Sequence, residues 1–271
     1  MTSVAVGQRL PQAPLVQVIA QIRFGEISAI DQHVEALRRS FKALGLPLYV
    51  PGTLQRIAIL AGGEPEVSAT PRWDFFDLHR HHGLVLTRDF LLLQTSEYSG
   101  FRDFSVRLHG AITALAQAIG DEAVTRVGLR YVDLVRAPGP DTDVREMVVP
   151  GLRGYPVEGL VATRGQAPTS RHETVVPTAA GVLAVRSQHR AVGGFLPPDL
   201  GGDGLEYNIP ALGPEEPVIV LDFDHYVPAP AMLLDPSAIV GVFGSLHEVM
   251  TEAFWSAVTD TALTHRSRKA P

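Results

Sequence analysis

Cysteine is missing from the chain altogether. Without a thiol the protein cannot form a disulfide, a cysteine-ligated zinc site or iron–sulfur cluster, or a thiolate nucleophile. The sequence also has no run approaching the roughly 20 apolar residues that a membrane-spanning helix needs. We therefore expect a cytoplasmic protein that has no membrane partner.

Basic residues are scarce, with 23 Lys and Arg against 29 Asp and Glu and a formal net charge of -6. Because binding to nucleic acid draws on clustered positive charge, this balance argues against a nucleic-acid partner. The phosphate-binding patterns G-x-x-x-x-G-K-[ST] and G-x-G-x-x-G and the serine elbow G-x-S-x-G are missing too. These absences disfavour ATPase, nucleotide-dehydrogenase and serine-hydrolase chemistry, and we expect no cofactor.

Alternating and helical patterns are both present. Residues 14–24 alternate like a strand with one buried face, whereas residues 30–44, 99–119 and 235–258 carry apolar stripes at helical spacing. Gly120 is expected to end the second helix. Runs of strands between these helices, without regular β-α-β alternation, indicate an α+β fold of largely antiparallel sheets packed against three long helices.

The chain divides by composition at a segment rich in Pro, Gly and Asp. We assign residues 1–137 to an N-terminal β-α-β-β-β-α-β half, 138–150 to a crossover, and 151–271 to further strands and a long helix. Both halves run from strands into a long helix, which suggests the hypothesis of two related halves. Residues 193–214 read as a long loop dense in Gly and Pro.

Three histidines are the candidate metal ligands. His79, His81 and His82 lie within four residues, and imidazole is the commonest ligand of transition metals in proteins. A metal site needs further ligands from elsewhere, and no H-E-x-x-H pattern is present. A polar hairpin turn before Gly83 is the alternative interpretation, and we favour it.

Arg130, Asp222 and Asp224 are the candidate binding residues. The two aspartates alternate with apolar residues, so they share one face of a strand. A guanidinium can hold a carboxylate or phosphate through paired donors. The same groups can instead hold one another, and we expect an ion-pair network joining the aspartates to Arg126 or Arg130 if the two strands are neighbours.

Several motifs together resemble those of a known family. They are Pro14-Leu15-Val16 with Ile22-Arg23-Phe24, Trp73-Asp74-Phe75, Arg126-Val-Gly-Leu-Arg-Tyr131 and Val220-Leu-Asp222-Phe-Asp224. The chain resembles, nearly end to end, a sporadically distributed family of bacterial proteins that is known chiefly as uncharacterised. That resemblance implies no reaction. The patchy distribution implies a role in accessory gene clusters such as those for defence, toxin–antitoxin function or peptide modification.

The leading hypothesis is a cytoplasmic accessory protein that binds a protein or peptide partner through a sheet face and the 193–214 loop. It rests on the absence of common catalytic patterns, so we lean against an enzyme. One alternative is a metal-dependent enzyme subunit that uses His79, His81 and His82. Another is an RNA-binding or RNA-processing module, since antiparallel sheets serve that role in several folds. The oligomeric state is left open.

Overall fold

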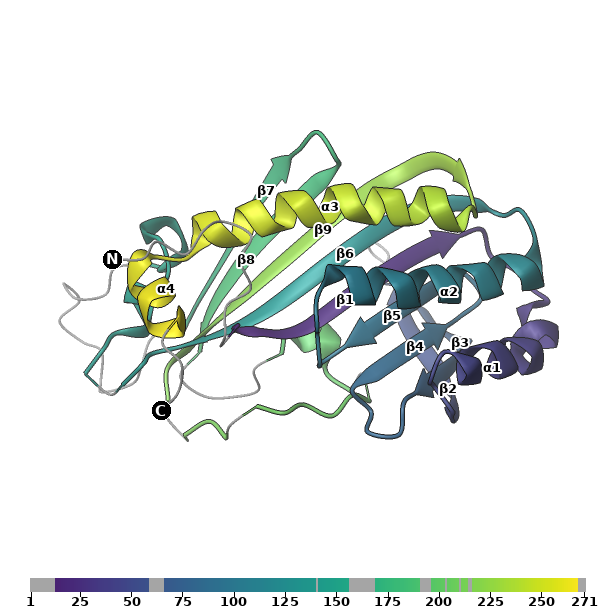
Figure 1. Ribbon diagram of the computed structural model, residues 1–271, viewed down its shortest axis with the longest axis horizontal. Helices are drawn as coiled ribbons and strands as arrows, with labels where there is room; N and C mark the ends of the chain where they lie inside the picture. The colour runs from purple at the N-terminus through teal and green to yellow at the C-terminus, as the bar shows by residue number, and fades with distance from the viewer. Residues whose placement is uncertain are drawn as a thin grey trace.

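The computed structural model describes residues 13–58, 66–139, 141–155, 169–190, 196–202, 204–209, 211–213 and 216–267. In these residues nine strands form one antiparallel sheet in the order β2-β3-β4-β5-β1-β6-β9-β8-β7 (Figure 1). The strands are β1 (Leu15–Phe24), β2 (Leu48–Ala58), β3 (Glu66–Phe76), β4 (His82–Leu86), β5 (Phe90–Thr95), β6 (Ala123–Arg136), β7 (Ser170–Pro177), β8 (Val182–Arg190) and β9 (Val218–Leu233). The predicted α+β class and antiparallel pairing are confirmed.

Helices pack against one face of this sheet. They are α1 (Val34–Ala43), α2 (Phe101–Ile119), α3 (Pro236–Ala257) and α4 (Asp260–Ser267), with the 3-10 turns η1 (Ile30–His33), η2 (Val144–Met147) and η3 (Pro150–Leu152). A fourth 3-10 turn, η4 (Pro198–Leu200), lies on the other face of the sheet. Only α2 and α3, with 19 and 22 residues, are long, whereas α1 has 10. The prediction of three long helices is therefore right for two. No helix in the described part of the chain is both long and apolar enough to cross a membrane.

Alternation along the strands separates the two faces of the sheet. In β9, Ile219, Leu221 and Phe223 join the main core under the helices, which we call the helix face. Their neighbours Asp222 and Asp224 lie on the other side, which we call the opposite face. Figure 1 shows α1, α2 and α3 in a row across the helix face. The core is continuous from α1 to α3, because one cluster of buried residues includes side chains from all of these elements.

The ends of α2 and α3 follow from local sequence. Asp235 caps α3 by accepting a hydrogen bond from the Ala238 amide at 2.9 Å, and Pro236 occupies the first turn, where a missing N–H costs nothing. Gly120 ends α2 with a φ of 81°, a conformation that L side chains rarely adopt. The predicted end of this helix is confirmed.

The strand order repeats one connectivity. In the first unit, β1 is followed by a meander that returns from β2 to β5, and β5 pairs with β1. In the second unit, β6 is followed by a meander from β7 to β9, and β9 pairs with β6. Each unit ends in a long helix, and β1 pairs with β6 at the centre. Four strands, not the three we predicted, separate α1 from α2, and the repeat begins again at β6, ahead of the predicted 138–150 crossover.

Candidate functional site

Charged side chains gather at the centre of the opposite face, where β6, β9 and β8 are neighbours. Arg130 holds Asp222 through two hydrogen bonds, Nε to Oδ1 at 2.7 Å and Nη2 to Oδ2 at 2.8 Å. Arg186 on β8 lies 3.3 Å from the same carboxylate, and Arg126 lies 3.5 Å from Asp224. The predicted ion-pair network is confirmed, because Arg130 and Asp224 are cross-strand partners in the β6–β9 register.

Burial makes this network electrostatically strong. The side chains of Arg130 and Asp222 are only 15% and 6% exposed. Burial by itself would lower the pKa of Arg130, but the hydrogen bonds that it donates to Asp222 and Asp199 outweigh burial and raise that pKa. Burial raises the pKa of Asp224, against the opposing effect of Arg126. Arg130 therefore already has two carboxylate partners within the chain, and they accept hydrogen bonds from Nε, Nη1 and Nη2 of its guanidinium.

The second carboxylate on Arg130 comes from the predicted long loop. Asp199 reaches Arg130 Nη1 at 2.5 Å from the short turn η4. Leu200 packs near it on an apolar cluster of the opposite face. Further along, the amide of Glu206 donates to the Arg80 carbonyl at 2.8 Å. The described residues of the 196–213 segment thus lie against the sheet, so the face that we expected to receive a partner is covered here by the chain itself. Residues 193–195 of the predicted loop lie outside the described residues.

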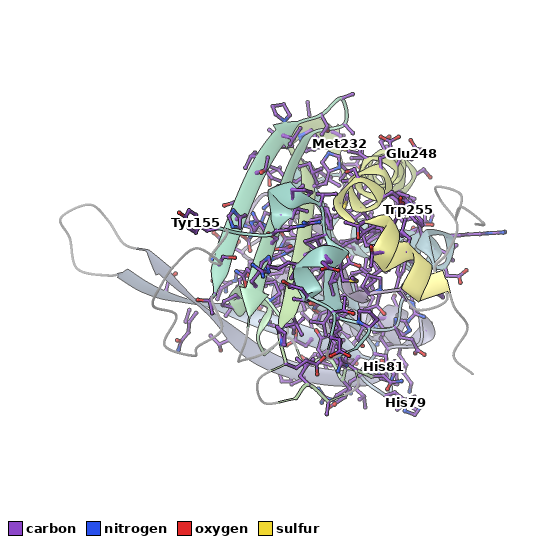
Figure 2. All side chains as sticks on the ribbon, turned by 90° about the vertical axis from the view of Figure 1, so that its left-hand side faces the viewer. His79, His81, Tyr155, Met232, Glu248 and Trp255 are labelled. Atoms are coloured by element: carbon purple, nitrogen blue, oxygen red, sulfur yellow. The ribbon has the colours of Figure 1, made fainter. Side chains whose placement is uncertain are left out.

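The three histidines do not converge. His79 and His81 have ring centroids 6.2 Å apart, and both lie at the periphery of the molecule in Figure 2. His81 Nδ1 is 3.1 Å from the Glu206 carbonyl, whereas His82 Nδ1 is 2.8 Å from Thr95 Oγ1. Among the described residues no group of three or more His, Asp or Glu side chains could hold a metal ion. The three histidines therefore do not form the predicted metal site, because His79 and His81 stack on each other whereas His82 contacts Thr95.

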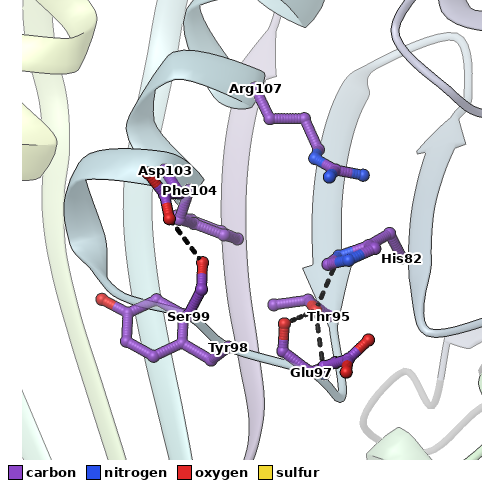
Figure 3. A pocket seen from close by; sticks show the side chains of 8 residues that line it. All are labelled: His82, Thr95, Glu97, Tyr98, Ser99, Asp103, Phe104 and Arg107. Atoms are coloured by element: carbon purple, nitrogen blue, oxygen red, sulfur yellow. Dashed lines mark hydrogen bonds between the residues drawn. The ribbon is translucent and has the colours of Figure 1, made fainter.

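His82 instead lines a small pocket between the ends of β4 and β5 and the first turns of α2. The other residues that line it are Thr95, Glu97, Tyr98, Ser99, Asp103, Phe104 and Arg107 (Figure 3). Its volume is about 30 Å³, which gives room for roughly two water-sized atoms. The sequence analysis did not single out Arg107. One feature of the sequence could have indicated it. Arg107 follows the buried Phe104 by one helical turn, and that spacing places a long basic side chain beside the buried face of α2.

A chain of buried hydroxyl and imidazole groups lies next to this pocket. The hydroxyls of Tyr98 and Tyr131 are 3.2 Å apart, and Tyr131 Oη is 2.8 Å from His247 Nδ1 on α3. The ring of Phe101 stacks on His247 with centroids 4.2 Å apart. Burial raises the pKa of Tyr131 and lowers that of His247, so both are neutral at pH 7. These contacts fix the start of α2 and the middle of α3 on the sheet.

The β2–β3 hairpin is the most prominent projection. Its strands pair along their whole length, from Leu48–Phe76 to Ala58–Glu66, whereas β4 pairs with β3 only over Trp73–Phe76. The outer part, residues 52–58 with 66–72, therefore has no third strand, and we call it the hairpin arm. Figure 2 shows this two-stranded ribbon extending away from the body of the molecule. Thr53 and Gln55 on its β2 side are exposed.

Comparisons of the chain with protein-family models, with curated proteins and with solved structures find no match. The resemblance to the sporadically distributed bacterial family therefore stays an expectation from motifs. Function has to be argued from the residues themselves.

Proposed function

We propose that this chain is a cytoplasmic accessory protein that binds a protein partner, and that the partner adds an extended segment to the free edge of β2. The observation that carries the proposal is the hairpin arm. Two-stranded ribbons are marginally stable in water, and a third strand is usually needed to hold them. A strand from a partner alongside β2 would provide it through backbone hydrogen bonds.

The chemistry of β2 favours an uncharged partner segment. Its sequence, Leu-Tyr-Val-Pro-Gly-Thr-Leu-Gln-Arg-Ile-Ala, contains Arg56 as the only charged residue. The other sheet edge differs, since β7 carries Arg171 and Glu173 and is supported by two further strands. Charged side chains on an edge strand discourage the addition of another strand. We therefore assign the partner to β2 rather than to β7.

This location differs from the one expected from sequence. The described residues of the 196–213 segment pack against the opposite face, where Asp199 binds Arg130, so they already cover the surface that we expected a partner to bind. The enzyme alternative depended on His79, His81 and His82 as metal ligands, and the described residues contain no group of three side chains that could hold a metal ion. The RNA alternative gains no support from the opposite face, because Arg126, Arg130 and Arg186 are paired with carboxylates.

The test uses two lysines on each edge. Thr53→Lys with Gln55→Lys places like charges along the β2 edge at exposed positions, and Thr174→Lys with Val176→Lys does the same on β7. The tagged wild-type chain and both variants are expressed with the native neighbouring genes, and retained proteins are identified by mass spectrometry. We expect one stoichiometric partner with the wild type and the β7 variant, and its loss with the β2 variant. Hydrogen exchange should slow in the arm on binding.

Two results would overturn the proposal. One is a partner retained equally by the β2 variant, which would place the interface elsewhere. The other is a purified chain that carries stoichiometric metal or turns over a substrate with no partner bound. Thermal melting of each variant controls for folding, and substitutions at such exposed positions should leave it unchanged.

A further inference from the structure

We infer that the pocket between β4, β5 and α2 binds a carboxylate group, with Arg107 as the bidentate donor and His82 as the second donor. Arg107 projects from α2 into this pocket toward His82 (Figure 3). It forms no hydrogen bond or ion pair with another residue in the described part of the chain, whereas Arg130, Arg136 and Arg186 are all paired with carboxylates. The carboxylate of Asp77 acts on Arg107 electrostatically, with no hydrogen bond between them. The paired donors of this half-buried guanidinium are therefore available to a planar anion.

The hydrogen bonds of Thr95 fix the ring of His82. Thr95 Oγ1 has one hydrogen and two carbonyl acceptors, His81 O at 3.0 Å and Glu97 O at 3.1 Å. It also accepts from the Glu97 amide at 3.0 Å. The 2.8 Å contact with His82 Nδ1 is therefore best satisfied by Nδ1–H donating to Thr95 Oγ1. His82 Nε2 is then the ring atom left to face a ligand, and it becomes a donor once the ring is protonated.

A carboxylate fits the pocket better than a phosphate. The pocket is small, with a volume of about 30 Å³, so a compact planar carboxylate suits it better than a bulkier tetrahedral phosphate. The acidic side chains Glu97 and Asp103 also line the pocket. They would repel a dianion more strongly than a monoanion, so the ligand we assign carries a single negative charge.

Protonation of His82 should couple to binding. Burial lowers the pKa of His82, and Arg107 on α2 lowers it further, while Asp77 and Glu97 oppose this and His81 adds a small lowering effect. A carboxylate bound between Arg107 and His82 would stabilise the imidazolium and raise that pKa. Binding should therefore tighten as the pH falls through the pKa of His82.

Such a carboxylate has two sources, a small free acid or the C-terminus of a peptide. The second source rests on the proposed function, since it would come from the protein partner. Three probes separate them: acetate, N-acetylglycine as a mimic of a peptide end, and N-acetylglycinamide, which has the same shape as N-acetylglycine without the charge. Each is titrated into the full chain while the imidazole resonances of His82 are followed by NMR across pH.

We expect both acids to shift the His82 resonances and raise its pKa, and the amide to do neither. Arg107→Gln should weaken binding roughly ten-fold or more, the loss expected for a charge-assisted hydrogen bond. Arg102→Gln, at an exposed position on the same helix, is the matched control and should bind as the wild type does. Stronger binding of N-acetylglycine than of acetate assigns the pocket to peptide ends, and equal binding assigns it to small acids.

The inference is overturned if the amide acts like the acids, or if Arg107→Gln binds them as tightly as the wild type. The variant with lysines at Thr53 and Gln55 should bind the probes normally. The experiments can therefore refute the carboxylate-binding inference without refuting the proposal for the hairpin arm, and the reverse.

Discussion

Replacing Asp222 by Asn is the most direct way to test what holds the centre of the sheet. The substitution keeps the size of the side chain and removes its charge, so Arg130 and Arg186 lose their shared carboxylate. Breaking a buried ion pair by removing one partner typically costs about 3–5 kcal/mol. Arg130 keeps Asp199 and Arg186 keeps Glu173. We therefore expect the lower end, a loss of about 3 kcal/mol in the free energy of unfolding.

Asp199→Ala provides the matched control, because Asp199 contacts the same guanidinium but is 62% exposed. Exposed ion pairs are worth about 0–1 kcal/mol, so this variant should lose less than about 1 kcal/mol. Urea unfolding followed by circular dichroism measures both values. Asp222→Leu combined with Arg130→Met should recover much of the loss, since apolar side chains of similar volume can replace a buried pair. If Asp222→Asn costs no more than Asp199→Ala, burial of the network is not what gives it strength.

Two further predictions concern pH and the β7–β8 turn. Burial lowers the pKa of His225 and His247 in the folded state, so below an unfolded pKa of about 6.5 the unfolded chain binds more protons. Stability should be level above about pH 7 and fall as the pH drops through 6.5. Urea unfolding at a series of pH values measures this, and equal stability at about pH 7.5 and about pH 5.5 would contradict it. Gly181 has a φ of 155°, and an added Cβ would lie 2.3 Å from the Tyr226 carbonyl oxygen. Gly181→Ala should therefore destabilise the chain much more than Gly45→Ala does. An added Cβ at Gly45 meets no atom within 4 Å, so that variant should lose only about 1 kcal/mol, from its positive φ alone. Similar urea-unfolding midpoints for the two variants would refute the steric argument.

The parts of the fold that follow from local pattern could be predicted. Alternation in β9 put Asp222 and Asp224 opposite Phe223, and this is confirmed because every residue of a strand alternates between faces. The helical stripe and Gly120 likewise gave the extent of α2. The length of β2 does not follow from local pattern, because Pro51 and Gly52 disfavour a strand and yet lie within it.

Features that join distant residues could not be predicted. Arg130 and Asp199 are 69 positions apart, and nothing in the Gly- and Pro-rich composition of the loop indicates that it packs on the sheet. The histidines show that residues close in sequence can also mislead, because their spacing indicated a common metal site. In the structure, His81 contacts the Glu206 carbonyl and His82 contacts Thr95, so the two side chains do not share a site. Arg107 was missed because its significance depends on the absence of a partner, which only the arrangement in space reveals.

The central pairing of β1 with β6 has a consequence for how the chain is made. On the ribosome, β1 can pair with β5 as soon as the first unit emerges, but its other edge stays bare until β6 follows. The other edge of β6 has no strand to pair with until residues 137–217 have been synthesised and β9 follows. Unpaired strand edges in a nascent chain are prone to aggregate, and such long-range pairings form slowly. The sheet is therefore completed only late in synthesis, and its central strands carry an unpaired edge until β9 is made.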